Sequence, residues 1–116
     1  PLSMRPILPF AMTDLRRLPD GDLLTLERRY EAGQGVGVQL RRIPRASVEA
    51  VAAGGPRVAL DGEIVASFDE SYQIDNMEGL AVRAGDRGEV LVYTVSDDNF
   101  NRSVQSTLLL MYELLP

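Results

Sequence analysis

The chain has 116 residues and contains no histidine, no cysteine and no tryptophan. Without histidine and cysteine, Ser-His-Asp and Cys-His catalytic systems within the chain are excluded. The same absences exclude disulfide bonds and ordinary zinc sites. Any catalysis by this chain therefore depends on carboxylates, hydroxyls, arginine, or a hard cation bound by oxygen ligands.

Lysine is missing too, so all 12 basic residues are arginine; 17 acidic residues give a formal net charge of −5. An acidic chain without a basic stripe does not match a nucleic-acid-binding surface, and we expect no nucleic-acid partner. No apolar run approaches the ~20 residues of a membrane-spanning helix, so no membrane span is expected. The start Pro1-Leu2-Ser3-Met4 is not a natural one and is typical of a piece of a longer protein, so the missing signal peptide carries no information.

The 45% apolar content is enough to build the core of one small fold. Residues 1–10 carry three prolines and are predicted to form an extended lead-in or linker. Two β repeats are expected after it, over residues 11–70 and 71–116. The predicted fold class is all-β, built from antiparallel sheets.

The first repeat shows strand patterns separated by turn signals. Strands are predicted over residues 11–18, 23–30, 36–43 and 63–68. Pro19-Asp20-Gly21-Asp22 is a strong turn, since proline presets its own φ and glycine accepts a positive φ. The strand at 63–68 pairs either with 36–43 or with a strand outside the chain. Residues 46–53 form either a short helix, capped by Ser47 or the preceding turn, or a loop.

Alternation in the first repeat indicates half-buried strands. Leu24 and Leu26 lie on one face of their strand, with Thr25 and Glu27 on the other. Residues 36–43 alternate in the same way, with valine and leucine against glycine, glutamine and arginine. One face of each strand is therefore expected in the core.

The second repeat begins with a hairpin. Residues 77–83 and 89–96 are predicted strands, joined by the turn Gly85-Asp86-Arg87-Gly88. Residues 105–114 form a third strand, although a short helix is the alternative. Its run Leu108-Leu109-Leu110-Met111 is apolar on both faces, so the strand should be covered on both sides. The four tyrosines are expected in the core or in packing between sheets: Tyr30, Tyr72, Tyr93 and Tyr112.

The two repeats share the order strand, tight turn, strand, loop, strand. In this alignment Leu15 matches Leu80, and Leu26 matches Val95. Antiparallel sheets of three or four strands, repeated at intervals longer than ~40 residues, are typical of propeller blades with insertions. The sequence thus predicts about two blades of a β-propeller-like repeat.

Carboxylates and amides gather where the second hairpin begins and where it ends. An antiparallel hairpin brings these two ends together. Calcium takes six to eight oxygen ligands, and a bound cation would neutralise a phosphate ester that carboxylates alone repel. The alternative is turn chemistry, in which Asp and Asn accept hydrogen bonds from nearby backbone N–H groups. The predicted metal ligands are Asp75, Asn76, Glu78, Asp97, Asp98 and Asn99.

Three of the charged residues have more specific predicted roles. Glu78 is the candidate catalytic residue, because a glutamate just before Gly79 should point to the channel side of an inner strand. Arg28 and Arg29 are candidate substrate-binding residues, since a guanidinium binds phosphate through a bidentate fork. The alternative for the arginines is a solvated strand end that pairs with nearby acids.

Segments of both repeats resemble a known family. The segments Asp75-Asn76-Met77-Glu78-Gly79-Leu80-Ala81-Val82, 91–100 and 105–114 resemble the C-terminal end of the bacterial phytase-like family, which carries the label "esterase-like activity of phytase". Residues 14–29 resemble that family's preceding repeat. The resemblance covers about residues 11–115. It implies a longer, exported or periplasmic β-propeller protein, of which this chain is about the last two blades.

The resemblance also implies an activity. It suggests a hydrolase acting on a small-molecule ester or phosphate ester, or a ligand-binding domain, with a carboxylate-rich site and possible calcium. Isolated blades leave strand edges and faces uncovered, so self-association or contact with the rest of a longer chain is expected. The rival interpretation is a non-catalytic structural or interaction module that binds a partner or a second copy through its strand edges.

Overall fold

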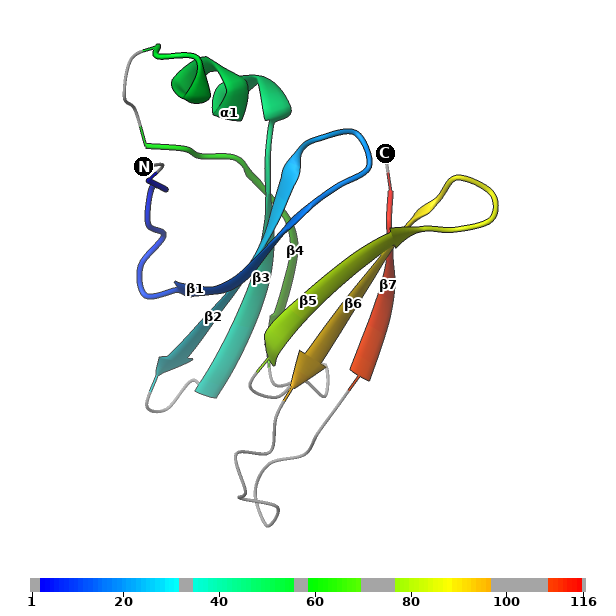
Figure 1. The fold of residues 1–116 in the computed structure, drawn as a ribbon. Helices are drawn as coiled ribbons and strands as arrows, with labels where there is room; N and C mark the ends of the chain where they lie inside the picture. The colour runs from blue at the N-terminus through cyan, green and yellow to red at the C-terminus, as the bar shows by residue number, and fades with distance from the viewer. Residues whose placement is uncertain (1–2, 32–34, 56–58, 70–76, 97–108, 116) are drawn as a thin grey trace.

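The structure is a computed structural model that describes residues 3–31, 35–55, 59–69, 77–96 and 109–115. Within these residues the chain forms seven strands and one helix. The strands make two antiparallel sheets that pack face to face (Figure 1). The predicted all-β class with antiparallel sheets is confirmed, and sheets of four and three strands are compatible with propeller-like blades.

The first sheet is a meander in which each strand pairs with the next one along the chain. Its strands are β1 (Ala11–Arg17), β2 (Leu23–Glu31), β3 (Gly35–Ile43) and β4 (Glu63–Asp69). The partner of β4 is β3, which decides between the two pairings considered for that strand. Helix α1 (Arg45–Ala52) follows β3, so the helical alternative for this region is confirmed.

The second sheet is also a meander. It contains β5 (Met77–Ala84), β6 (Val90–Ser96) and β7 (Leu109–Leu114), in that order. The predicted hairpin is confirmed, with Ala84 opposite Val90 near the turn and Met77 opposite Ser96 at the far end. Within the described residues no fourth strand pairs with β7, which leaves its outer edge open.

The two hairpin turns have the same backbone hydrogen bonds. In the first turn, Leu18 N–H donates to the Asp22 carbonyl (2.8 Å) and Gly21 N–H donates to the Leu18 carbonyl (2.9 Å). In the second turn, Gly85 N–H donates to the Glu89 carbonyl (2.7 Å), and Gly88 N–H donates to the Gly85 carbonyl (3.1 Å). Gly21 and Gly88 have positive φ values of 94° and 80°, which residues with a Cβ rarely adopt.

These equivalent turns set the alignment of the two repeats. Counting outward from the turns along the registers, Leu15 is equivalent to Val82 and Leu26 to Tyr93. The predicted match of Leu15 with Leu80 was therefore wrong by two positions, as was that of Leu26 with Val95. A shift of two positions keeps each residue on the same face of its strand, so the apolar alternation alone could not reveal the error.

The apolar core lies between the two sheets. It is formed by fully buried leucines and valines of both sheets: Leu18, Leu24, Leu26, Val38, Leu40, Leu80 and Val92. Each buried side chain of this size stabilises the fold by roughly 1.5–3 kcal/mol relative to exposure. The ring of Tyr112 on β7 stacks on Phe68 of β4, with 5.2 Å between centroids, at the outer side of the core.

The opposite face of the first sheet is buried as well, which corrects the prediction of half-buried strands. Glu27, Gln39 and Arg41 each expose only 2% of their surface. The N-terminal lead-in runs against this face, because the Arg5 carbonyl accepts a hydrogen bond from Arg41 (2.7 Å). The lead-in is held in turn by backbone hydrogen bonds on either side of a parallel bridge to Leu60.

Strands β1 and β5 lie next to each other where the two sheets meet (Figure 1). The Asp14 carboxylate accepts a hydrogen bond from Leu80 N–H (2.8 Å), and Arg16 Nε donates to the Leu80 carbonyl (2.6 Å). Two side chains of β1 therefore bind both backbone polar groups of one residue on β5. They take the place that a neighbouring strand would otherwise occupy at that residue.

Two predictions of burial are wrong. Tyr30 is 75% exposed rather than packed in the core, whereas Tyr93 and Tyr112 are half-buried; Tyr72 lies outside the described residues. Strand β7 is covered on one side only, because Leu109 and Met111 are 71% and 62% exposed on its other side. The residues that cover a strand are not encoded in its own apolar pattern.

Candidate functional site

The backbone of the second hairpin brings the two predicted site segments to the same place. Met77, at the start of β5, pairs with Ser96, at the end of β6. Glu78 lies in β5 where the register shifts between Met77 and Gly79, which marks a β-bulge. Bulges re-aim side chains and are common next to active sites.

The rest of the predicted calcium site lies outside the described residues. These are Asp75, Asn76, Asp97, Asp98 and Asn99, and the side chain of Glu78 is not described either. Among the residues that are described, no three acidic side chains gather closely enough to hold a metal ion. The calcium site therefore stays a prediction that rests on the pairing of the two strand ends.

The predicted substrate-binding arginines lie near the end of β2. Arg29 is largely engaged: its Nη1 donates to the Gly35 carbonyl (3.1 Å) and lies 3.8 Å from a Glu31 carboxylate oxygen. Its guanidinium also stacks over the Phe10 ring, 5.9 Å from the centroid. Arg28 lies opposite Ala11 and is half-buried. Arg29 thus has a clear structural role in holding the β2–β3 end and the lead-in together.

Sequence reasoning missed a fully buried carboxylate, Glu27. Its oxygens accept hydrogen bonds from Thr25 Oγ1 (2.6 Å), Gln39 Nε2 (3.2 Å) and Arg41. Arg41 donates through both Nε (2.8 Å) and Nη2 (3.0 Å), which makes a bidentate ion pair. Because Glu27 is buried and accepts four hydrogen bonds, it acts as a structural anchor rather than as a group that meets substrate.

The remaining donor of Arg41 extends this network to the surface. Its Nη1 donates to the Arg5 carbonyl and to a carboxylate oxygen of Asp61 (3.2 Å). The Gly62 backbone N–H, and then Arg41, hold the pKa of Asp61 below its usual value. Arg41 therefore joins the sheet, the lead-in and the segment before β4 through a single side chain.

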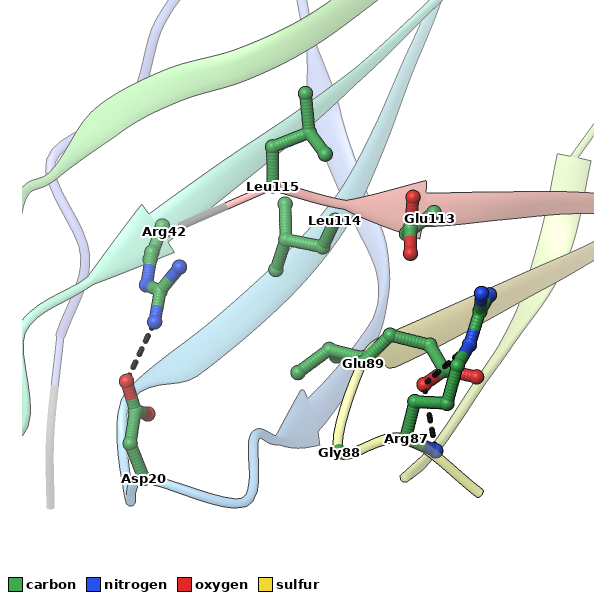
Figure 2. Close-up of a pocket in the computed structure, with 9 residues that line it drawn as sticks. Asp20, Arg42, Arg87, Gly88, Glu89, Glu113, Leu114 and Leu115 are labelled. Atoms are coloured by element: carbon green, nitrogen blue, oxygen red, sulfur yellow. Dashed lines mark hydrogen bonds and ion pairs between the residues drawn. The ribbon is translucent and has the colours of Figure 1, made fainter. Parts of the chain in front are cut away.

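A solvent-open cavity of about 660 Å³ lies at the turn end of both hairpins. Figure 2 shows the Asp20–Arg42 pair on one side of this cavity and Arg87 with Glu89 on the other. Gly88 and Val90 of the second hairpin also line the cavity, as do Glu113, Leu114 and Leu115 around the end of β7. The cavity is at the opposite end of the sheets from Met77 and Ser96.

The charges of this cavity do not suit a phosphate. Arg42 is held by two carboxylates, through Nη2 to Asp20 and through Nε to Asp22 (2.8 Å). The lining contains three acidic residues and two arginines, so its formal charge is negative. An anionic ligand would have to displace an existing ion pair. The cavity is therefore not the counterpart of the predicted phosphate-ester site.

Asp22 also begins helix α1. Its Oδ1 accepts a hydrogen bond from the backbone N–H of Arg45, the first helical residue (2.8 Å). An oxygen from the neighbouring turn thus satisfies a helix N–H that has no partner within the helix. The predicted cap at Ser47 is wrong, and so is the alternative, a cap from the turn immediately before the helix. The cap comes instead from Asp22 in the β1–β2 turn. The Arg45 N–H and the Arg42 guanidinium lower the pKa of Asp22.

We expect Asp22→Ala to lower the free energy of unfolding by about 1–2 kcal/mol at pH 7, since a helix cap and an ion-pair partner are lost. The folded-state pKa of Asp22 is lowered, so its stabilisation is fully present above the ordinary carboxyl value and disappears as the pH falls through the lowered one. The difference between wild type and variant should therefore shrink in acid. Urea unfolding from pH 7 to pH 2 measures it.

Asp86→Ala is the matched control, because Asp86 is an exposed aspartate in the other hairpin turn. It should change the free energy of unfolding by less than about 0.5 kcal/mol. Equal losses in the two variants would contradict the assigned role of Asp22. So would a loss in Asp22→Ala that is as large at pH 2 as at pH 7.

An apolar cleft of about 430 Å³ opens where the outer strands of the two sheets diverge. Val65 and Phe68 line it from β4, and Tyr112 and Leu114 line it from β7. The cleft is continuous with the core between the sheets. It offers apolar contact and the Tyr112 ring, but within the described residues its charged members are only Arg42, Glu63 and Glu113 at the rim.

The sequence gives only ambiguous indications of the four charged residues that the sequence analysis did not assign to these contacts: Asp20, Asp22, Glu27 and Arg41. Asp20 and Asp22 stand in a Pro-Asp-Gly-Asp turn, which explains them fully as turn formers. Arg41 and Glu27 stand at polar positions of alternating strands, which normally face water. Only the coverage of that face by the lead-in shows that they form a buried pair.

The fold and the hairpin ends together define a class: an all-β protein of two antiparallel meanders whose candidate site lies at the ends of adjacent strands. The chain matches the phytase-like family, described as having the esterase-like activity of phytase, over residues 4–100. Because this match covers well over half of the sequence, the chain belongs to the phytase-like family. No curated protein and no solved structure matches the chain. Among the described residues, no helix is long and apolar enough to cross a bilayer.

Proposed function

We propose that this chain contributes to the hydrolysis of an ester or phosphate ester at a carboxylate-rich site at the ends of β5 and β6. The observation that carries the proposal is the pairing of Met77 with Ser96 beside the register shift at Glu78. Membership of the phytase-like family supports the reaction class. The ligand set of the site is Asp75, Asn76, Glu78, Asp97, Asp98 and Asn99.

The donor chemistry of this set fits calcium. All six side chains offer carboxylate or amide oxygens, which are the ligands that calcium prefers. The cation would neutralise the negative charge of a bound phosphate ester. Glu78, as a carboxylate, is proposed to accept the proton of the attacking water, because the chain has no histidine for that role.

The position of Arg28 and Arg29 near the end of β2 supports this proposal. Both hairpin turns line one cavity, so the other ends of the two hairpins point to the opposite side of the molecule. Figure 1 shows the end of β2 and the end of β6 on that same side. Arg28 and Arg29, each after release from its present contacts, are the proposed binding residues for the anionic part of the substrate.

We expect calcium to raise the melting temperature of this chain by several degrees relative to the same protein in chelator, because a ligand that binds only the folded state stabilises it. In Glu78→Gln the calcium-dependent rise should fall, and hydrolysis of p-nitrophenyl acetate or p-nitrophenyl phosphate should drop by about a hundredfold. Thermal melts and a colorimetric rate assay measure the two effects.

Glu89→Gln is the control, since Glu89 is a glutamate in the turn at the opposite end of the same hairpin. It should leave the calcium response and the rate unchanged. A calcium response without turnover would limit the site to binding. Unchanged calcium response and unchanged turnover in Glu78→Gln would refute the site assignment.

A second candidate is a non-catalytic interaction module. It is favoured by the outer edge of β7, which pairs with no other strand in the described part of the chain, and by the exposed apolar side chains Leu109 and Met111 on the same strand. An exposed strand edge binds an extended segment by strand addition. This function predicts no turnover of either ester together with stable association in solution.

A further inference from the structure

The second sheet has an apolar face that no segment within residues 3–31, 35–55, 59–69, 77–96 and 109–115 covers. The outer face consists of the side chains of β5, β6 and β7 that point away from the first sheet. Val95, Leu109 and Met111 are 40%, 71% and 62% exposed there, and Leu91 and Tyr93 are half-buried beside them. The largest exposed apolar side chains of this sheet are thus gathered on one side of it.

The first sheet shows what covers such a face in this fold. Counted from the hairpin turns, Leu91 and Tyr93 are equivalent to Leu24 and Leu26. Leu24 and Leu26 are completely buried against the second sheet. The equivalent positions on the outer face therefore have the chemistry of a sheet-on-sheet contact, in which two sheets pack about 10 Å apart.

The register divides the outer face into three rows across the strands. Arg83, Leu91 and Glu113 lie opposite one another in the first row. Ala81, Tyr93 and Met111 form the second row, and the third is Gly79, Val95 and Leu109. On β5 the outer-face residues are two small residues and a positively charged arginine. On β7 they are two large apolar residues and a negatively charged glutamate.

This arrangement is complementary to itself. A two-fold axis parallel to the strands and running along β6 lays β5 of one chain over β7 of the other while keeping the rows aligned. Arg83 then meets Glu113 of the second copy, and the small Ala81 meets its large Met111. Gly79 likewise meets Leu109 of the second copy, so both charge and side-chain size match across the contact.

We propose that the outer face binds the outer face of a second copy of this chain, giving a two-fold symmetric dimer. A head-to-tail stack would instead need the far face of the first sheet, where residues 3–10 already cover the Glu27–Arg41 pair. The symmetric contact uses residues that are exposed or half-buried in the single chain. The proposal concerns a face and not a strand edge, and it is independent of the catalytic site.

Sedimentation velocity over a micromolar concentration series tests the dimer. The chain should approach twice its mass of 12.8 kDa. Met111→Lys buries a charge at each of two symmetric contacts and should weaken association more than a hundredfold. Retention of the circular-dichroism spectrum and the melting curve of the monomer shows that this variant is folded. A wild-type chain that stays monomeric throughout overturns the proposal.

Charge reversal tests the predicted arrangement. Arg83→Glu alone and Glu113→Arg alone each place like charges together twice per dimer and should weaken association about tenfold. The double variant restores the pairing and should return to within about threefold of wild type. Arg87→Glu is the control, since Arg87 is 86% exposed at its side chain in the hairpin turn and off this face. A double variant no stronger than either single one overturns the arrangement.

Cross-linking gives a readout that does not depend on affinity. The chain has no cysteine, so one introduced cysteine reports one position. Val95 lies on β6 and therefore meets Val95 of the second copy, and Val95→Cys should give a covalent dimer with a short bis-maleimide. Arg87→Cys, treated in the same way, should not. Equal yields from the two variants would place the contact elsewhere and overturn the proposal.

Discussion

Arg41→Met is expected to lower the free energy of unfolding by about 3–5 kcal/mol, because it leaves the Glu27 carboxylate buried without its cation. That loss is a large part of the 5–15 kcal/mol that stabilises a typical domain. The variant also frees the Arg5 carbonyl, so the lead-in loses a hydrogen bond. Urea unfolding followed by circular dichroism measures the effect.

The double variant Glu27→Leu/Arg41→Met separates charge burial from packing. Replacing both members of a buried ion pair with apolar residues of similar size is often close to neutral. We expect the double variant to recover most of the lost free energy, short of full recovery because Gln39 Nε2 also loses its acceptor. A double variant less stable than Arg41→Met would contradict the account of the pair as a desolvated, mutually dependent unit.

Leu80→Ala is expected to cost about 2–5 kcal/mol, as for other buried leucines. Leu80 is 3% exposed and belongs to the core cluster that joins the two sheets. Its backbone is the residue that Asp14 and Arg16 bind, so loss of the side chain weakens the docking of β5 on β1. Denaturant unfolding gives the loss, and hydrogen exchange shows whether the second sheet is the part that becomes exposed.

Leu115→Ala makes the same chemical change at a leucine that is 71% exposed. It should change the free energy of unfolding by no more than about 0.5 kcal/mol. If the two leucine variants were equally stable, the assignment of Leu80 to the core that joins the sheets would be contradicted.

The strands could be predicted because their signals are local. The alternation over 36–43 and the turn glycines Gly21 and Gly88 fix strand type, turn position and meander pairing within a few residues. Helix α1 was predicted only as one of two alternatives. Its cap comes from Asp22, more than 20 residues earlier in the chain, and no local pattern contains that information.

Burial could not be predicted in the same way. Glu27 and Arg41 occupy positions that alternation assigns to solvent, and they are buried because residues 3–10 return over that face. In the opposite sense, the apolar Leu109 and Met111 were expected to be covered and are not. In both cases the deciding factor is which distant segment lies on the face, which the strand's own residues do not determine.

The sequence predicted the location of the candidate site but could not establish the roles of its residues. The hairpin pattern correctly sets the start of β5 beside the end of β6, with Met77 opposite Ser96. The ligand roles of Glu78 and its neighbours depend on side-chain geometry that strand patterns do not encode. The calcium and hydrolysis experiments above therefore test roles, while the location rests on the register.

The contact of Asp14 and Arg16 with Leu80 has a consequence for the order of assembly. Among the described residues, each pairing between named strands joins neighbours in a meander, whereas this contact spans more than 60 residues of chain. Contacts between sequence neighbours close small loops and form early, while contacts across long loops carry the larger entropic cost. The hairpins should therefore form first, with docking of the sheets as the late step. Until that step, both apolar faces of the second sheet are open to other chains.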